Sequence, residues 1–217
     1  MADKNTETWE SKLSRIGEYY SELVGAHGAN PLSCDYGRPT SQKRKFGAVA
    51  EVMPLSGKHV LDVGCGLGDF ADYLDAEIGK VQYTGVEIAP AMLKEARQLR
   101  PHLDLRQLDI LRETPEGQFD LVTANGIFYL LGTDAKYLTE KIITRMFSLT
   151  RYAVAFTTLS TWTDYQESGE FYADPLETLS FCRTLTPWVV LRHDYAPHDF
   201  TVYLYKQSPF QEDGGGP

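Results

Sequence analysis

The sequence is poor in cysteine and has no long apolar run. Its three cysteines, Cys34, Cys65 and Cys182, are odd in number and far apart, which argues against a disulfide framework and against a paired-cysteine metal site. No apolar run approaches the roughly 18 residues of a membrane span. The polar N-terminus lacks the apolar core of a signal peptide. We therefore expect a cytoplasmic protein without a membrane partner.

Basic side chains are also scarce. Lys and Arg number 21 against 30 Asp and Glu, which gives a net charge of −9, so a nucleic-acid partner is not expected. The one basic run is Lys43-Arg44-Lys45. Two readings stay open: a solvated helix face, or a cation (Arg44 or Lys45) that binds a carboxylate of a ligand.

The length of 217 residues and the 42% hydrophobic content suit one large domain with a sizeable core. The expected order of helices and strands, together with the glycine-rich end, divides the chain into three parts. Residues 1–54 are expected to form an N-terminal helical cap, residues 55–208 the main domain, and residues 209–217 a disordered, glycine-rich tail.

Strands and helices are expected to alternate along the main domain. Helical periodicity covers residues 8–24 and 41–53, with a loop over 25–40 between them. The later elements are strands at 59–63, 83–87, 103–108, 119–124, 152–158, 188–193 and 200–205, and helices at 69–78, 90–100, 136–149 and 175–185. Because the last two strands follow each other directly, they must be antiparallel. We predict an α/β fold: a doubly wound, mostly parallel seven-stranded sheet with helices on both faces, a C-terminal antiparallel hairpin and an N-terminal helical cap.

The most informative segment is Val60-Leu-Asp-Val-Gly-Cys-Gly-Leu-Gly-Asp-Phe70, between the first strand of the main domain and the helix that follows. Such a loop lies where open α/β sheets bind ligands. Dinucleotide loops have the spacing G-x-G-x-x-G, whereas here Asp69 stands where the third glycine would fall. An acid at a helix N-terminus opposes a pyrophosphate, and Asp62 adds negative charge. The loop therefore favours a cationic ligand over NAD.

The run Asp62-Val-Gly-Cys-Gly-Leu-Gly68 resembles motif I of the class I S-adenosylmethionine-dependent methyltransferases, and the resemblance extends over roughly residues 55–206. It implies S-adenosylmethionine as the cofactor. Asp62 would orient the methionine moiety, and the loop residues Gly64, Cys65, Gly66 and Gly68 would lie around the cofactor.

Positions after the next two strands fit the same resemblance. Glu87 ends the second strand, where a carboxylate can accept both ribose hydroxyls, and Ile88 would pack on the adenine. Asp109 matches the acid that meets the adenine amino group, with the backbone of Ile110 nearby.

The segment Phe119-Asp-Leu-Val-Thr-Ala-Asn-Gly126 resembles the fourth-strand motif, so the backbone near Asn125 and Gly126 would line the methionine end. No proline pair follows, unlike in DNA amino-methyltransferases. Asn125 stands where catechol-type enzymes place a magnesium-binding acid, so no metal is expected. A hydroxyl or amine of a small molecule remains as the acceptor, methylated by in-line displacement.

Side chains expected to reach the acceptor come from the cap, the loops after the fourth and fifth strands, and the last hairpin. His27 and His198 are the preferred bases, because both fall in predicted loops and histidine titrates at about pH 6.5; Tyr129 is the third catalytic candidate. The wider set is Tyr20, His27, Tyr36, Tyr129, Trp162, Tyr165, His193, Tyr195 and His198.

Two alternatives to the methyltransferase stay open at this stage. A non-catalytic S-adenosylmethionine-binding protein would carry the same glycine loop. An NAD-dependent oxidoreductase is disfavoured by Asp69 and by the late antiparallel hairpin. The sequence leaves the oligomeric state as monomer or homodimer.

Overall fold

The computed structural model describes residues 7–28, 30–35 and 39–210. Tyr36 and the tail from residue 211 onward lie outside them. The N-terminal elements are α1 (Trp9–His27), the 3₁₀ turn η1 (Pro31–Cys34) and α2 (Pro39–Ala50). The remaining elements are β1 (His59–Val63), α3 (Asp69–Glu77), β2 (Gln82–Glu87), α4 (Pro90–Leu99), β3 (Asp104–Gln107), β4 (Phe119–Asn125), η2 (Gly132–Asp134), α5 (Ala135–Leu149), β5 (Thr150–Leu159), α6 (Pro175–Leu185), β6 (Val189–Arg192) and β7 (Asp199–Tyr205).

The strands form one sheet in the order β3-β2-β1-β4-β5-β7-β6. The first five run parallel, and β7 lies antiparallel between β5 and β6. The predicted fold class is therefore confirmed, hairpin included. Since β1 pairs with both β2 and β4, the strand order reverses there, which places a ligand-binding crevice at the carboxyl ends of these strands.

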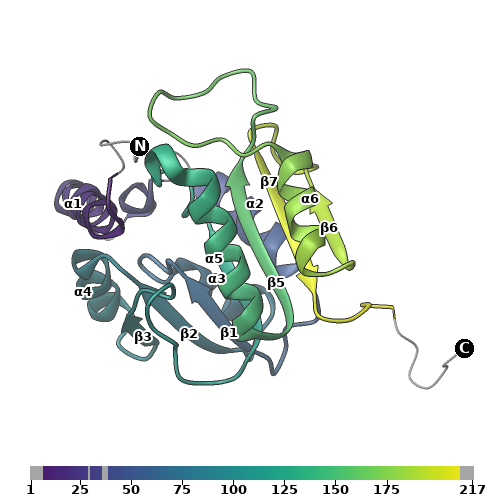
Figure 1. The fold of residues 1–217 in the computed structure, drawn as a ribbon. Coiled ribbons are helices and arrows are strands. Elements are labelled where there is room, and N and C mark those ends of the chain that lie inside the picture. Colours follow the sequence, from purple (N-terminus) through teal and green to yellow (C-terminus); the bar gives the residue numbers. More distant parts are fainter. Residues whose placement is uncertain (1–6, 29, 36–38, 211–217) are drawn as a thin grey trace, which may run out of the picture.

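Helices cover both faces of the sheet (Figure 1), as the alternation along β1 requires. Val60 packs in one apolar cluster with Phe46 of α2 and Phe70 of α3. Leu61 points to the opposite face and packs in a cluster with Ile143 of α5. Hence α2 belongs to the same layer as α3, and α1 with η1 is left to cover the carboxyl ends of the strands.

Helix α1 is longer than the sequence indicated. Its N-terminus is capped by the Thr8 side chain, which accepts from the Ser11 N–H, and it ends at His27 instead of near residue 24. Gly25 is exposed and interrupts nothing; the helix stops at Gly28, whose φ is +58°, a conformation that glycine adopts easily.

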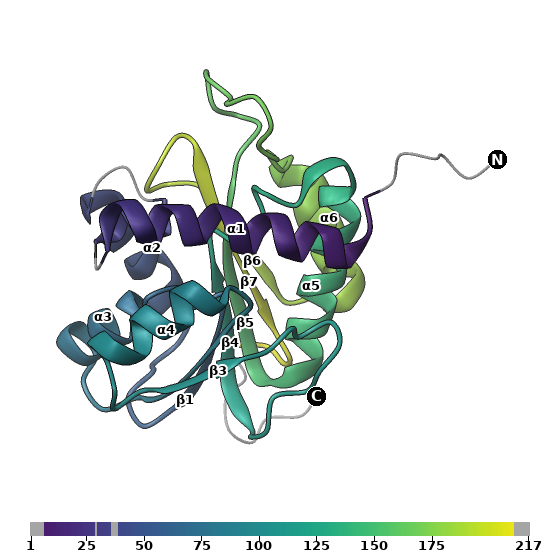
Figure 2. The same cartoon turned by 90° about the vertical axis from the view of Figure 1, so that its left-hand side faces the viewer.

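Helix α1 runs across the molecule (Figure 2), and hydrogen bonds fix it to the loop after β4. The Lys12 ammonium, 2% exposed, donates to the Leu131 carbonyl at 3.1 Å, and Arg15 donates to the Leu130 carbonyl at 2.9 Å. None of the described helices is both long enough and apolar enough to span a membrane.

Candidate functional site

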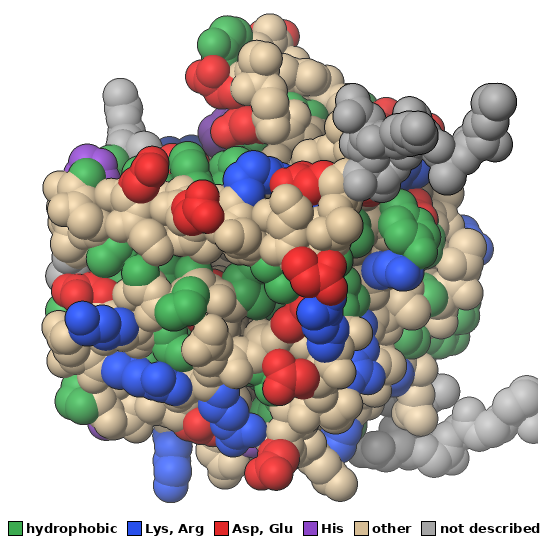
Figure 3. Space-filling view, turned by 60° about the vertical axis from the view of Figure 1, so that its left-hand side comes forward, with side chains coloured by type: hydrophobic (Ala, Val, Ile, Leu, Met, Phe, Trp, Pro, Cys, Tyr) green, Lys and Arg blue, Asp and Glu red, His purple; other side chains and the backbone are tan. Residues whose placement is uncertain are grey.

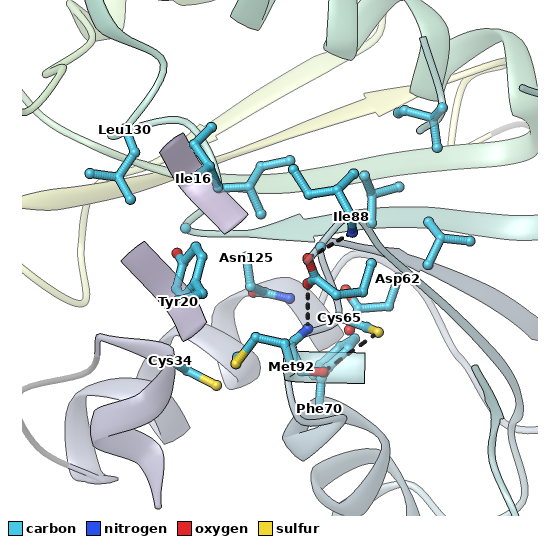
Figure 4. Close-up of a pocket in the computed structure, with 18 of the residues that line it drawn as sticks. Ile16, Tyr20, Cys34, Asp62, Cys65, Phe70, Ile88, Met92, Asn125 and Leu130 are labelled. Atoms are coloured by element: carbon cyan, nitrogen blue, oxygen red, sulfur yellow. Dashed lines mark hydrogen bonds between the residues drawn. The ribbon is translucent and has the colours of Figure 1, made fainter. Parts of the chain in front are cut away.

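A cavity lies at the carboxyl ends of β1, β2 and β4, beneath α1. Its empty space is about 1060 Å³, including the open mouth. The loop after β1, the end of β2 and the end of β4 form its floor, and the apolar face of α1 forms its roof. Figure 4 shows side chains from these segments around one space, with Tyr20 of α1 beside Asn125 of β4.

The glycine loop after β1 is shaped by positive backbone angles. Gly64 has φ +69°, and a β-carbon there would come within 2.4 Å of the Ile127 side chain. The N–H groups of Gly64 and Cys65 both donate to the Val86 carbonyl, at 2.8 and 3.1 Å. The loop is thus folded tightly over the end of β2, and only glycine is compatible with position 64.

Asp62 is the most unusual charged group of the cavity wall. Its side chain is 2% exposed; Oδ2 accepts from the Tyr83 hydroxyl at 2.7 Å, and Oδ1 has no hydrogen-bond partner among the described residues. Burial raises the pKa of Asp62 to about 7, although the bond from Tyr83 and, more weakly, the neighbouring Asn125 side chain oppose the rise. A buried, half-satisfied carboxylate on a cavity is suited to a ligand ammonium.

Glu87 faces the same cavity but is well satisfied. Oε1 accepts from the backbone N–H groups of Ile88 and Ala89, at 2.7 and 2.9 Å, and Oε2 accepts from the N–H of Gly66 at 3.0 Å. Burial raises its pKa, and the three N–H donors oppose that shift. The carboxylate ties the glycine loop to the β2–α4 turn and retains lone pairs for ligand hydroxyls.

Asn125, at the end of β4, supplies a second set of unsatisfied polar atoms. Both amide atoms of its side chain are buried and make no hydrogen bond of ordinary geometry in the described structure, although the side chain lies near enough to Asp62 to lower the pKa of that carboxyl. The next residue, Gly126, is fixed by donating its N–H to the Thr157 hydroxyl at 3.0 Å. Buried polar atoms without partners are uncommon in folded proteins. Together with Asp62, they make the cavity fit a ligand with a polar, cationic end.

Most of the cofactor-binding residues expected from the sequence lie around this cavity. Those that line it are Asp62, Gly64, Cys65, Gly66, Glu87, Ile88, Ile110, Asn125 and Gly126. Gly68 and Asp109 do not line it. Gly68 is the N-cap residue of α3, and a β-carbon there would meet side chains of Arg100 and Leu103.

Asp109 holds the roof in place. Its Oδ2 accepts from the Trp9 indole N–H at 2.6 Å, and its Oδ1 accepts from the Leu111 N–H at 2.9 Å. Trp9 itself lines the cavity. In the structure Asp109 therefore connects α1 to the β3–β4 segment, and Trp9 lies between Asp109 and the site.

The three catalytic candidates are not brought together. His27 is exposed at the end of α1, because the helix continues through the segment expected to be a loop, and His198 is exposed in the turn before β7. Neither lines the cavity. Tyr129 lies close to it: the hydroxyl pairs with that of Tyr20 at 3.1 Å and donates to Asp35 Oδ2 at 2.8 Å.

Tyr129 lines a smaller chamber that adjoins the cavity, with about 510 Å³ of empty space. Cys34 and Gly126 line both spaces. The chamber also contains Lys45, for which sequence analysis left two roles open. Its ammonium is buried and pairs with Asp199 Oδ2 at 2.6 Å, so it is not a solvated helix cation.

Several lining residues escaped sequence reasoning. Trp9 and Ile16 fit the helical periodicity of residues 8–24, but that pattern does not distinguish a core face from the roof of a cavity. Cys34 and Met92 line the cavity from η1 and α4. Neither stands in a motif, so no local signal marks them.

Replacing Trp9 by Phe tests the roof. The change removes the bond to Asp109, so we expect α1 to open more often, amide exchange in residues 9–27 to accelerate, and affinity for S-adenosylhomocysteine to fall by roughly 3- to 10-fold, about 1 kcal/mol. Hydrogen exchange and calorimetric titration measure the two effects. Trp188→Phe, at an exposed position before β6, is the control, and equal behaviour of the two variants would contradict this role of Trp9.

Comparison with known proteins agrees with this geometry. Residues 60–149 match a family model described as a methyltransferase domain. Rv1506c of Mycobacterium tuberculosis, a protein named as a methyltransferase, is 30% identical over 157 residues, which are 68% of this chain and 92% of that protein. Trans-aconitate 2-methyltransferase of Methylobacterium nodulans is 32% identical over 90 residues, 42% of this chain. The match spans only 35% of that relative's length.

Solved structures share the fold. The structure titled as a complex of DhpI with S-adenosylhomocysteine aligns with a TM-score of 0.65 over 93% of this chain and 100% of that chain. Its sequence is 15% identical. At this identity the likeness concerns the arrangement of helices and strands.

Proposed function

The chain belongs to the class I S-adenosylmethionine-dependent methyltransferases, and on that premise we propose that it methylates a hydroxyl or an amine of a small molecule, without a metal ion. One observation carries the proposal. The cavity at the point where the strand order reverses has a buried carboxylate, Asp62, whose Oδ1 lacks a hydrogen-bond partner among the described residues. A cationic ligand such as S-adenosylmethionine would supply that partner.

We assign the cofactor contacts from the lining residues. Asp62 would bind the amino group of the methionine moiety, and Glu87 would accept the ribose hydroxyls with its remaining lone pairs. Ile88 and Ile110 would contact the adenine. Asn125 would hydrogen-bond the methionine end, beside the backbone of Gly126.

The bound cofactor supplies a methyl group on a positively charged sulfur, and in-line displacement joins the methyl carbon to a lone pair of the acceptor while the C–S electron pair stays on sulfur. The protein must orient the acceptor and remove its proton. Burial raises the pKa of Tyr129 far above its ordinary value, so its hydroxyl is neutral near pH 7. We propose that Tyr129 passes the acceptor's proton to Asp35, with which it is already hydrogen-bonded.

Tyr129→Phe separates proton transfer from binding. The variant keeps the ring but loses the hydroxyl, so we expect kcat to fall roughly 10- to 100-fold with the first acceptor found in a screen. The Kd for S-adenosylhomocysteine should stay within about 2-fold, because Tyr129 does not line the larger cavity. Tyr137→Phe, at an exposed position of α5, should change neither. A loss of cofactor affinity equal to the loss of kcat would contradict the assignment.

A small-molecule acceptor suits the charge distribution better than a nucleic acid. On the face shown in Figure 3, basic side chains are interspersed with acidic ones and form no broad basic surface, and the whole chain carries −9. Polyanions bind to clustered positive charge.

The direct test is transfer of radiolabelled methyl groups from S-adenosylmethionine to a library of small hydroxyl and amine compounds. We expect at least one compound to become labelled, at a rate that EDTA does not change. Labelling that disappears with EDTA and returns with added magnesium would contradict the metal-independent mechanism.

A further inference from the structure

The chamber beside the cofactor cavity has an acidic wall. Three carboxylates line it, Asp35, Glu170 and Asp199, with one ammonium, Lys45. Asp35 follows η1, Lys45 belongs to α2, and Asp199 begins β7. Glu170 lies in the long segment between β5 and α6, which projects at the top of Figure 1. Phe128 and Leu159 add apolar surface.

One of the three carboxylates is neutralised within the wall. Asp199, 0% exposed, pairs with the Lys45 ammonium at 2.6 Å, and the hydroxyl of Tyr195 donates to its other oxygen. Lys45 is therefore already engaged with an anion of the chain. An anionic acceptor would have to compete with Asp199 for it, which is unfavourable in a buried site.

The other two carboxylates are bonded to hydroxyl groups and not to cations. Asp35 Oδ2 accepts from Tyr19 and Tyr129, both at 2.8 Å, and Glu170 accepts from Tyr172 at 2.6 Å. Within the described residues neither takes part in an ion pair. Both carboxylates contribute to raising the pKa of Tyr19 to about 12, after the larger effect of burial, so both lie within electrostatic reach of the Tyr19 hydroxyl.

A separate observation, an unsatisfied hydroxyl in the wall, favours a polar ligand in the chamber. Thr158 of β5 lines it with a side chain that is 1% exposed, and its hydroxyl oxygen has no hydrogen-bond partner among the described residues. A buried hydroxyl without a partner loses roughly 1–3 kcal/mol of hydrogen bonding. A ligand in the chamber would restore that bond.

We propose that this chamber binds the methyl acceptor, which is a small organic amine carrying a positive charge at neutral pH, held between Asp35 and Glu170 with Thr158 as a further hydrogen-bond partner. The ammonium gives one proton to Asp35 through the Tyr129 hydroxyl, which frees the nitrogen lone pair that takes the methyl group. The inference rests on the proposed methyl transfer and restricts the acceptor from a hydroxyl or an amine to an amine. Because Cys34 and Gly126 line both spaces, this amine would lie next to the methionine end. The arrangement disfavours carboxylate acceptors.

Ligand-observed NMR on protein saturated with S-adenosylhomocysteine tests the charge preference without knowing the acceptor. The probes are benzylamine, benzyl alcohol and benzoate, and the same three head groups on phenylethyl and cyclohexylmethyl skeletons. We expect amines to bind at least roughly 3- to 10-fold more tightly than the alcohol or carboxylate of the same skeleton.

Substitutions in the acidic wall of the chamber test whether its carboxylates cause the preference for amines. Glu170→Gln keeps an oxygen for the Tyr172 bond but removes the charge, and Asp35→Asn tolerates the φ of +58° at that position because asparagine adopts such angles readily. Each should remove most of the preference, and Glu170→Lys should reverse it. Asp164→Asn, exposed on the same segment as Glu170, is the matched control and should leave it unchanged.

The binding results distinguish a wrong function from a wrong acceptor. If S-adenosylhomocysteine does not bind to the folded protein, the proposed function itself is overturned. If it binds but no amine binds, or if alcohols and carboxylates bind as tightly as amines, this inference alone is overturned. Equal effects of Glu170→Gln and Asp164→Asn would overturn it as well.

Discussion

Asp62→Asn should weaken S-adenosylhomocysteine binding by roughly 30-fold or more and, at pH 8, make the ligand-free protein more stable. The binding loss follows because the ligand ammonium would lose a buried ionic partner, which costs about 2–5 kcal/mol. The stability gain follows because the carboxylate is 2% exposed and is satisfied on one oxygen only. Asparagine keeps an oxygen for the Tyr83 bond and carries no charge to bury.

The pH dependence of that stability has a defined sign. Folding raises the pKa of Asp62 to about 7 from about 3.9 in an unfolded chain. A carboxyl shifted upward favours the folded state at low pH, and this contribution is lost as the pH rises from about 4 through 7. At pH 8 the loss amounts to at most about 4 kcal/mol. The difference in Tm between Asp62→Asn and the wild type should therefore grow between pH 5 and pH 8.

Binding to the wild type should depend on pH in the opposite direction. Because the ligand ammonium needs the ionised carboxylate, affinity should fall below about pH 7, by up to roughly 10-fold per pH unit. Titrations and scanning calorimetry at pH 5 and 8 measure both effects, with Asp75→Asn, exposed on α3, as the control. Wild-type affinity in Asp62→Asn, or a lower Tm than the wild type at pH 8, would contradict the role of Asp62.

Glu87→Gln should weaken the same ligand by roughly 10- to 100-fold but lower the stability of the protein. Three backbone N–H groups converge on the two oxygens of this carboxylate. A glutamine side chain has one oxygen, so in either orientation its NH₂ group faces at least one N–H donor. An unsatisfied buried donor costs about 1–3 kcal/mol, and the tie between the glycine loop and the β2–α4 turn would loosen.

Chemical denaturation and calorimetric titration of Glu87→Gln measure the two losses. Glu22→Gln, exposed on α1, makes the same chemical change away from the site and should cause neither. The contrast with Asp62→Asn is the informative result: two acids of one cavity should shift stability in opposite directions. If Glu87→Gln were as stable as the wild type, the three N–H bonds would not hold the loop.

The sheet was predictable because its signals are local. Strand β1 occupies the predicted residues, and α6 begins and ends where Pro175 and the apolar periodicity indicated. The glycine loop was equally clear, since its spacing and Asp69 are read directly from the chain. The first two helices differed from the prediction. An exposed glycine such as Gly25 does not end α1, which tertiary contacts hold, and α2 spans Pro39–Ala50 instead of residues 41–53.

The adjoining chamber was not predictable, because it is assembled from distant segments. Asp35, Tyr129, Glu170 and Asp199 stand far apart in the sequence, and no local pattern indicates that they meet. Asp109 shows the same difficulty within a motif: the sequence gives its position at the end of a strand, whereas its bond to Trp9 depends on where α1 packs. The preference for His27 and His198 rested on residue type and predicted loops, which do not specify which way a side chain faces.

The cofactor site is best tested by calorimetric titration of the purified protein with S-adenosylhomocysteine, with NAD as the parallel ligand and Asp62→Asn as the parallel variant. We predict micromolar binding of S-adenosylhomocysteine, no binding of NAD, and loss of the first signal in the variant. Absence of S-adenosylhomocysteine binding to a folded sample, or binding that the variant leaves unchanged, would contradict the account of this cavity.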